Sequence, residues 1–401
     1  MEVEELHVAV DVGCQRHRVA IASARGRMLA EFDIEHNASG FTEFFARIEA
    51  QRLEGQPVWV AMEGCNGYAR PLDAQVRRRG YRLLNVNNLK LARFKEMFPG
   101  PAKTDALDTH RMLELLRVQN QVALAKGIVR QVSEVPAANA QLQRLTRRRR
   151  QLVHEKVRIV NRMQADLHAV CPGLVGITAE VDIRWFLGLL CCRKTLPQLA
   201  TVRRTSLLKI RAVGPKYATI IAQWQRRAHF APEVEWVGPM IVIDAKRTLA
   251  LLDEIETLEQ LIEELATSST LYQRIKSVPG FGLVCSAELA GEIGTYERFD
   301  GEASLALYLG AASLDDNSGK HAGCKTARQV NRRGKAALMT AVDRHRKWVA
   351  ISQAYYEKKR AQGKKHNQAI RALARHLVRV LWALFVNDRD YELREITAKA
   401  A

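Results

Sequence analysis

Two short apolar segments, each followed by an acidic residue, constrain what this chain can fold into. Segments 7–10 and 58–62 have the length and the residue types of buried strands, and a glycine follows each acid closely, so that the backbone can turn there. Two further acids, three residues apart, open a predicted helix and therefore share one helical face. In chain order, the four acids are Asp11, Glu63, Asp105 and Asp108.

Carboxylates at the ends of adjacent strands, faced by a pair on a helix, can converge on divalent metal ions. Two such ions about 3.5–4 Å apart stabilise both the attacking and the leaving oxygen of a phosphoryl displacement. Taken singly, an aspartate after a strand is usually a turn former, and an acidic pair on a helix is usually exposed to solvent. The order of the elements favours metal-dependent phosphodiester chemistry over that ordinary explanation.

The elements around the acids are those of a ribonuclease-H-like α/β domain. Three early strands that can pair in antiparallel fashion are followed by an alternation of helices and strands. In that fold the acids gather at strand ends and on a late helix. Besides the two strands that end in acids, the predicted elements are strands 18–24, 28–34 and 81–86 and helices 39–53 and 69–79.

The composition indicates a soluble protein with a polyanionic partner. A formal net charge of +19, from 62 Lys and Arg against 43 Asp and Glu, favours nucleic acid above all and no membrane. The 401 residues suffice for two or three domains. No apolar run reaches the ~18 residues of a spanning helix, and the first residues lack the features of a signal peptide. Seven cysteines without a CxxC pair indicate reduced thiols, so we expect a cytoplasmic, nucleoid-associated bacterial protein.

A long basic helix and an acidic helix are predicted in the middle of the chain. The first, at 139–170, carries a run of four arginines beside an apolar stripe, so it can pack on one side and bind phosphates on the other. The second, at 241–266, has heptad spacing. It suits a coiled-coil partner, either the basic helix or a second protomer, and an ordinary amphipathic core helix fits as well. The arginines are Arg147, Arg148, Arg149 and Arg150.

The C-terminal region is predicted to be mainly helical and to contact nucleic acid. Residues 278–282 resemble a helix-hairpin-helix turn, whose amides and following helix N-terminus can hold a phosphate, and 210–215 is a weaker copy. From 320 to 365 there are fourteen Lys and Arg against two acids, interleaved with aromatic residues. The basic candidates there are Lys320, Lys325, Arg328, Arg332, Arg333 and Lys335.

Ser318 directly precedes this basic region. Its hydroxyl could face a phosphate, although a serine beside glycine is more often a turn residue. A set of motifs in order changes that reading, because the chain resembles, nearly end to end, the IS110 family of insertion-sequence transposases, which are bridge-RNA-guided DEDD recombinases. The motifs are VDVG at 10–13, MEGCNGY at 62–68, KTDALD at 103–108, VPGFG at 278–282, YLG at 308–310, SGK at 318–320 and RRGK at 332–335.

The resemblance implies specific domains and residue roles that composition and spacing alone do not predict. It implies a RuvC-like N-terminal domain in which Asp11, Glu63, Asp105 and Asp108 bind Mg²⁺, and a C-terminal transposase domain in which Ser318 attacks DNA to form a phosphoserine. It also implies a structured guide RNA that pairs with donor and target DNA. A homo-oligomer, dimer or tetramer, would compose each active site from different protomers.

Two other functions fit the same residues. A RuvC-type junction resolvase or nuclease that uses water needs the acids but not the serine. A non-catalytic nucleic-acid-binding protein needs only the basic surface. For the recombinase we expect a RuvC-like domain at 1–131, the basic helix, an irregular insert and the coiled-coil helix at 132–272, and the transposase domain with the serine at 273–401.

Overall fold

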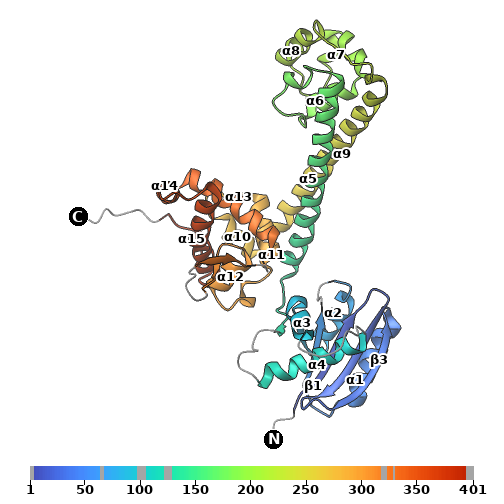
Figure 1. Ribbon diagram of the computed structural model, residues 1–401, viewed down its shortest axis with the longest axis vertical. Coiled ribbons are helices and arrows are strands. Elements are labelled where there is room, and N and C mark those ends of the chain that lie inside the picture. Colours follow the sequence, from blue (N-terminus) through green and yellow to red (C-terminus); the bar gives the residue numbers. More distant parts are fainter. Residues whose placement is uncertain are drawn as a thin grey trace, which may run out of the picture. The chain divides into compact units, whose positions relative to one another are not determined.

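The computed structural model of this protein describes residues 4–63, 67–96, 105–121, 129–317, 323–327 and 330–393. The chain divides into two compact units, Met1–Glu134 and Val135–Ala401. Figure 1 shows a first unit built on a sheet and a second that is almost entirely helical, and each is described by itself below. Within the described ranges, no helix combines the length and the apolar content that crossing a membrane requires.

The first unit has a six-stranded mixed sheet in the order β3-β2-β1-β4-β5-β6. The first three strands pair in antiparallel fashion, β1, β4 and β5 are parallel, and β6 is antiparallel to β5. The expected early antiparallel strands and the α/β alternation after them are therefore present. The strands are β1 (Leu6–Val12), β2 (Arg16–Ser23), β3 (Met28–Glu35), β4 (Val58–Glu63), β5 (Arg82–Val86) and β6 (Val129–Gln131).

Helices cover the two faces of this sheet differently. One face buries bulky residues such as Val8 and Val10 against Phe44 and Phe45 of α1. The other face is lined with alanines of β1, β2 and β4, which pack against α4. Because alanine is small, α4 can approach this face closely. The helices of the unit are α1 (Ala38–Gln51), α2 (Arg70–Arg78), α3 (Asn88–Lys95) and α4 (Asp105–Gln121).

The second unit is organised around two long helices, α5 (Ala137–Val170) and α9 (Val234–Ala266), which run side by side (Figure 1). Their ion pairs fix an antiparallel register, since Arg149 pairs with Glu259 near one end and Arg162 with Asp244 near the other. Leu152, Ile159, Leu251 and Ile255 are buried between the two helices. Of the two partners predicted for the acidic helix, this unit supplies the basic helix of the same chain.

The start of the acidic helix was predicted too late. The sequence indicates a helix from about 241, but α9 begins at Val234 and contains Pro239. A proline inside a helix removes one backbone hydrogen bond. Burial of Val234 and Ile241 in the core of the adjoining helical cluster stabilises the extra turns. Tertiary packing therefore overrides the local signal.

The two ends of the long pair carry different helical clusters. One end holds a cap whose core includes Trp185, Phe186 and Trp224, and the other holds a C-terminal bundle (Figure 1). A two-stranded hairpin, β7 and β8, is inserted in the bundle. The cap contains α6 (Arg184–Cys191), α7 (Arg204–Leu207) and α8 (Pro215–Gln225). The bundle contains α10 (Thr270–Lys276), α11 (Leu283–Ile293), α12 (Glu302–Tyr308), β7 (Ser313–Asp315), β8 (Cys324–Thr326), α13 (Arg332–Trp348), α14 (Ala350–Ala361) and α15 (His366–Val386).

Candidate active site and nucleic-acid interface

Asp11 and Glu63 lie side by side at one edge of the sheet. Strands β1 and β4 are parallel and in register up to the pair Val10 and Met62, so that the next residue of each strand is one of the two acids. Side chains alternate between faces along a strand. Ala9 and Ala61, two residues earlier, both belong to the core beneath α4. Both acids are therefore on the α4 face of the sheet.

Helix α4 brings its first turn to the same edge. A Cβ added to Gly26 would lie 3.4 Å from Cδ of Arg117, so the C-terminal half of α4 lies beside the turn between β2 and β3. That turn follows Ser23, which pairs with Leu6 at the beginning of β1. Because α4 therefore runs opposite to β1, its N-terminal end lies near the carboxyl ends of β1 and β4, where the two acids are.

Asp108 is buried on the sheet-facing side of α4. It is 6% exposed and lies one turn before Met112, which packs in the alanine-lined core. Its carboxylate is 3.5 Å from Nη1 of Arg111. Three of the four predicted acids are thus placed on one face at one edge of the sheet, and Asp105, the fourth, begins α4. The structure does not describe the Asp105 side chain.

The donor set suits a hard divalent cation. Magnesium is bound through carboxylate oxygens, phosphates and water, and three of the described positions supply carboxylates. Among the side chains that the structure describes, no three acidic, histidine or cysteine side chains form a group close enough to hold a metal ion. The residue types of Asp11, Glu63 and Asp108 fit a divalent metal ion. Their side chains are too far apart to define a coordination geometry.

Arg18 is a polar neighbour of the acids that the sequence did not indicate. It faces Asp11 across the β1–β2 pair, and its guanidinium donates to Glu31 at 2.8 Å and to Asp33 at 3.3 Å. Glu31 also contacts Nε2 of His110 on α4, at 2.5 Å. Burial alone would raise the pKa of Glu31, but the hydrogen bonds from His110 and Arg18 outweigh it and lower that pKa. This network holds the Arg18 guanidinium beside the acidic edge and connects α4 to β3.

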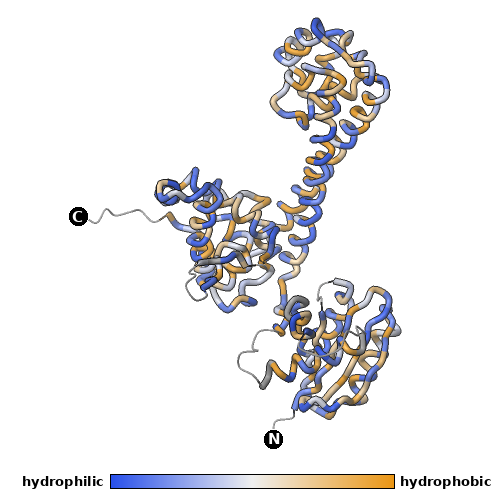
Figure 2. Tube along the Cα trace, in the orientation of Figure 1, coloured by the Kyte–Doolittle hydropathy of each residue, from blue (hydrophilic) through white to orange (hydrophobic). Residues whose placement is uncertain are grey.

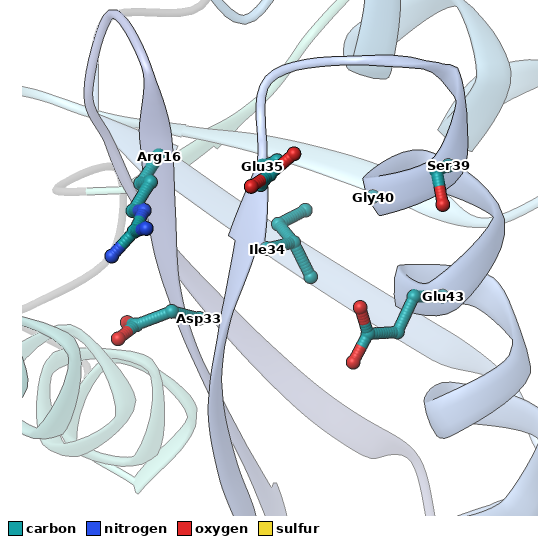
Figure 3. Close-up of a pocket in the computed structure, with 7 residues that line it drawn as sticks. All are labelled: Arg16, Asp33, Ile34, Glu35, Ser39, Gly40 and Glu43. Carbon is teal, nitrogen blue, oxygen red and sulfur yellow. The ribbon is translucent and has the colours of Figure 1, made fainter.

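A separate pocket opens where β3 ends and α1 begins (Figure 3). Three carboxylates and one guanidinium line it, and such a balance repels phosphate. The pocket therefore does not suit a nucleic-acid backbone, and we assign it no part in the acidic site. Its lining residues are Arg16, Asp33, Ile34, Glu35, Ser39, Gly40 and Glu43.

Ser318 lies outside the described residues, as do Lys320 and Arg328. The described ends of the hairpin meet just before and after the serine. The backbone N–H of Asp316 donates to the carbonyl of Gly323 at 2.9 Å, and the N–H of Gly323 donates to Oδ1 of Asn317 at 3.0 Å. The sequence thus places the serine immediately after Asn317, beyond the last described residue of this arm. Ser313, five residues before Ser318 in the sequence, is exposed in β7.

Three of the four consecutive arginines of α5 bind carboxylates within the second unit. Arg147 donates to Glu292 at 2.7 and 2.8 Å, and Arg150 donates to Glu288 at 2.6 Å through two nitrogens. Arg149 donates to Glu259 of α9 at 2.7 Å. These guanidiniums were expected to bind phosphates, and the structure gives them internal acceptors instead. Only Arg148 of the four is exposed to solvent and so accessible to a phosphate.

The remaining basic candidates have mixed surroundings. Arg332 and Arg333 are exposed in the first turn of α13, whereas the stem of Lys335 packs against Gly310. Lys325 pairs with Asp316 across the hairpin at 2.7 Å. The basic stretch continues into α14, one of the most hydrophilic segments in Figure 2.

The turn that resembles a helix-hairpin-helix turn in the sequence precedes α11. It connects α10 to α11, and the exposed Gly282 is the N-cap residue of α11. The other side of the turn is occupied by protein, because Nδ1 of His345 contacts the carbonyl of Pro279 at 2.7 Å. Burial, opposed in part by this hydrogen bond, lowers the pKa of His345, which favours the neutral imidazole.

Two transposase family models and several insertion-element proteins match the chain. A model described as a transposase of the DEDD type matches residues 8–172, and one described as transposase, IS116/IS110/IS902 family, matches residues 272–357. The 44.8 kDa protein of insertion element IS116 from Streptomyces clavuligerus is 24% identical over 396 residues, 96% of each chain. The 42 kDa protein of insertion element IS900 from Mycobacterium paratuberculosis is 26% identical over 399 residues, 98% of each chain.

The matched regions include the elements described above. The first model covers the six-stranded sheet, its acidic edge and α5, and the second covers α10 to α14 with the hairpin. A transposase acts on DNA, and a DEDD domain indicates dependence on a divalent metal. The chain therefore carries the transposase domains of the IS110/IS116/IS902 family, to which it belongs.

Proposed function

We propose that this transposase cleaves and rejoins DNA strands through a phosphoserine at Ser318, with Asp11, Glu63, Asp105 and Asp108 holding Mg²⁺. The observation that supports the proposal is the position of Asp11, Glu63 and Asp108 on the same face of the sheet, the one covered by α4, and near the same edge. The strand order, with an antiparallel β2 between β1 and β3, supports a ribonuclease-H-like, or RuvC-like, domain.

The reaction balances without an oxidant or any other co-reactant. The Ser318 hydroxyl oxygen forms a bond to phosphorus while the bond from phosphorus to one bridging oxygen of the strand breaks. The serine proton ends on that leaving oxygen, so the strand is left with a free hydroxyl. Attack by the hydroxyl of another strand on the phosphoserine reverses these changes and regenerates the serine.

The acids and the basic surface take different parts in this proposal. A serine hydroxyl is a weak nucleophile near neutral pH. When bound, Mg²⁺ would stabilise the charge that develops on the phosphoryl oxygens. Asp11, Glu63, Asp105 and Asp108 would hold the ion. Arg18 limits the freedom of the acidic edge by binding Glu31 and Asp33. Arg332 and Arg333 bind backbone phosphates.

We further propose that a structured guide RNA pairs with donor and target DNA, and that each active site combines residues of different protomers. The net charge of +19 suits a protein that holds several nucleic-acid strands at once. The acids belong to the first unit and the hairpin that leads to Ser318 to the second. That division is compatible with acids and serine from different copies of the chain.

Trapping of covalent protein–DNA adducts tests the proposal. The full-length protein, incubated with Mg²⁺, the RNA encoded beside its gene and DNA carrying the element ends, is expected to form an adduct that survives denaturation. Ser318→Ala should abolish the adduct, whereas Ser313→Ala should retain it. Asp11→Ala should abolish cleavage while DNA binding stays within about twofold, because one carboxylate contributes little to phosphate contacts. Adducts that persist in Ser318→Ala would place the nucleophile elsewhere.

A nuclease that uses water is the second candidate, because Asp11, Glu63 and Asp108 all belong to the first unit. For such an enzyme, Ser318→Ala would leave strand cleavage intact and no adduct would form in the unaltered protein. A non-catalytic nucleic-acid-binding protein would show neither cleavage nor any effect of Asp11→Ala.

A further inference from the structure

We infer that Glu292 is a positioning residue that fixes the base of the β7–β8 hairpin relative to α5. The inference rests on the proposed function in one respect, namely that this hairpin leads to the nucleophile. Glu292 is 1% exposed although it is charged, and it lies near the C-terminal end of α11. Because a buried carboxylate is costly unless it is paired, its partners indicate what it does.

The partners of Glu292 come from three separate parts of the second unit. The guanidinium of Arg147 on α5 binds both carboxylate oxygens, at 2.7 and 2.8 Å. Nδ2 of Asn331 donates to Oε2 of Glu292 at 2.6 Å. The hydroxyl of Tyr308 donates to the backbone carbonyl of Glu292 at 2.8 Å and accepts from Nδ2 of Asn331 at 2.6 Å. A single glutamate therefore connects α5, the end of α12 and the start of α13.

Tyr308 and Asn331 are the two roots of the segment that contains the hairpin. Tyr308 ends α12 before β7, and Asn331 is the N-cap residue of α13, accepting a hydrogen bond from the N–H of Gly334. The N–H of Asn331 donates to the carbonyl of Tyr308 at 2.8 Å, which closes the base. Gly310, with φ of +63°, redirects the chain just after Tyr308. The position of both roots thus depends on Glu292.

Helix α5 provides the fixed side of this arrangement. Asn139 and Gln143 donate to the carbonyls of Gly294 and Gly291, and Arg147 and Arg150 continue the same row of contacts along α5. Because α5 also makes the long pair with α9, the hairpin base is tied to the most extended rigid element of the unit.

Glu288 offers a matched control for Glu292. It lies one turn earlier on α11, is 4% exposed and binds Arg150 through two hydrogen bonds of 2.6 Å. The carboxylate of Glu288 binds α5, whereas Glu292 also contacts both hairpin roots, Asn331 through its carboxylate and Tyr308 through its backbone carbonyl. Glu288→Gln and Glu292→Gln therefore remove equivalent ion pairs, and only the second weakens the hairpin base.

The experiment combines hydrogen exchange with adduct trapping on full-length protein. In Glu292→Gln, peptides spanning residues 313–326 should exchange about tenfold faster, as the loss of one charged hydrogen bond allows. The rate of phosphoserine formation should fall at least as much at saturating DNA, while the Kd for DNA stays unchanged. Glu288→Gln should match the unaltered protein in hairpin exchange and in adduct rate.

A second variant covers the case in which Glu292→Gln fails to fold. Asn331→Ser keeps a side-chain oxygen that can cap α13 and removes the amide donor to Glu292 and Tyr308, so it should reproduce both effects. Equal behaviour of the Glu292 and Glu288 variants, or unchanged hairpin exchange in Asn331→Ser, would overturn the inference. If the unaltered protein forms no adduct, the proposed nucleophile fails, and the hairpin exchange still decides the role of Glu292.

Discussion

Gly291 shows how one residue without a side chain determines the contact between α5 and α11. A Cβ built there would lie 2.5 Å from the backbone nitrogen of Gln143 and 2.7 Å from its Cα. Backbone atoms cannot rotate away as a side chain can. Any larger residue must therefore move α11 away from α5, together with the buried Glu288 and Glu292.

We predict that Gly291→Ala destabilises the second unit by about 1–3 kcal/mol, the usual cost of overpacking. Gly176→Ala is the control, since nothing lies within 4 Å of a Cβ at that position. Thermal denaturation of the two full-length variants gives the comparison. Equal midpoints would show that α11 accommodates the added methyl group.

The acidic edge could be predicted from the sequence, and the internal arginine pairs could not. Asp11 and Glu63 each end a recognisable apolar strand, and strand alternation alone puts both on one face. Arg147 and Arg150 look like phosphate ligands because their partners, Glu292 and Glu288, are more than a hundred residues away in the chain. No local pattern connects such positions, so only the folded contact shows that these charges are already neutralised.

At the scale of elements, the packing between α5 and α9 depends on a few apolar layers. Leu251 of α9 is fully buried, in one cluster with Leu152, Ile159 and Ile255. The sequence indicated this stripe through its heptad spacing. It could not distinguish a partner helix in the same chain from one in a second protomer, because both bury the same residues.

Leu251→Ala should destabilise the helical pair by about 2–5 kcal/mol, because it leaves a cavity in a thin core. Leu261→Ala on the same helix should have little effect, since Leu261 is 45% exposed. Urea denaturation followed by circular dichroism at 222 nm measures both variants. A small loss in Leu251→Ala, equal to that of the control, would mean that the ion pairs alone hold the two helices together.

At the scale of the whole molecule, the charge of +19 makes DNA binding depend strongly on salt. Each phosphate contact contributes about −0.9 to the slope of the logarithm of affinity against the logarithm of salt concentration. Removing Arg332 and Arg333 together should make this slope shallower by about two. Arg226→Ala with Arg227→Ala, an exposed pair at the end of α8, changes the net charge equally and should leave the slope unchanged. Fluorescence anisotropy at several salt concentrations separates a local contact from a general loss of charge.

The antiparallel course of α5 and α9 also limits how relatives of this chain can differ in size. The polypeptide leaves the C-terminal bundle along α5 and returns along α9. The ion pairs Arg149–Glu259 and Arg162–Asp244 connect the two helices. A deletion of whole turns in one of these helices alone would shift the partners of every ion pair beyond the deletion. Insertions and deletions are therefore tolerated only when both helices change together. Among relatives, α5 and α9 should differ in length by the same number of turns.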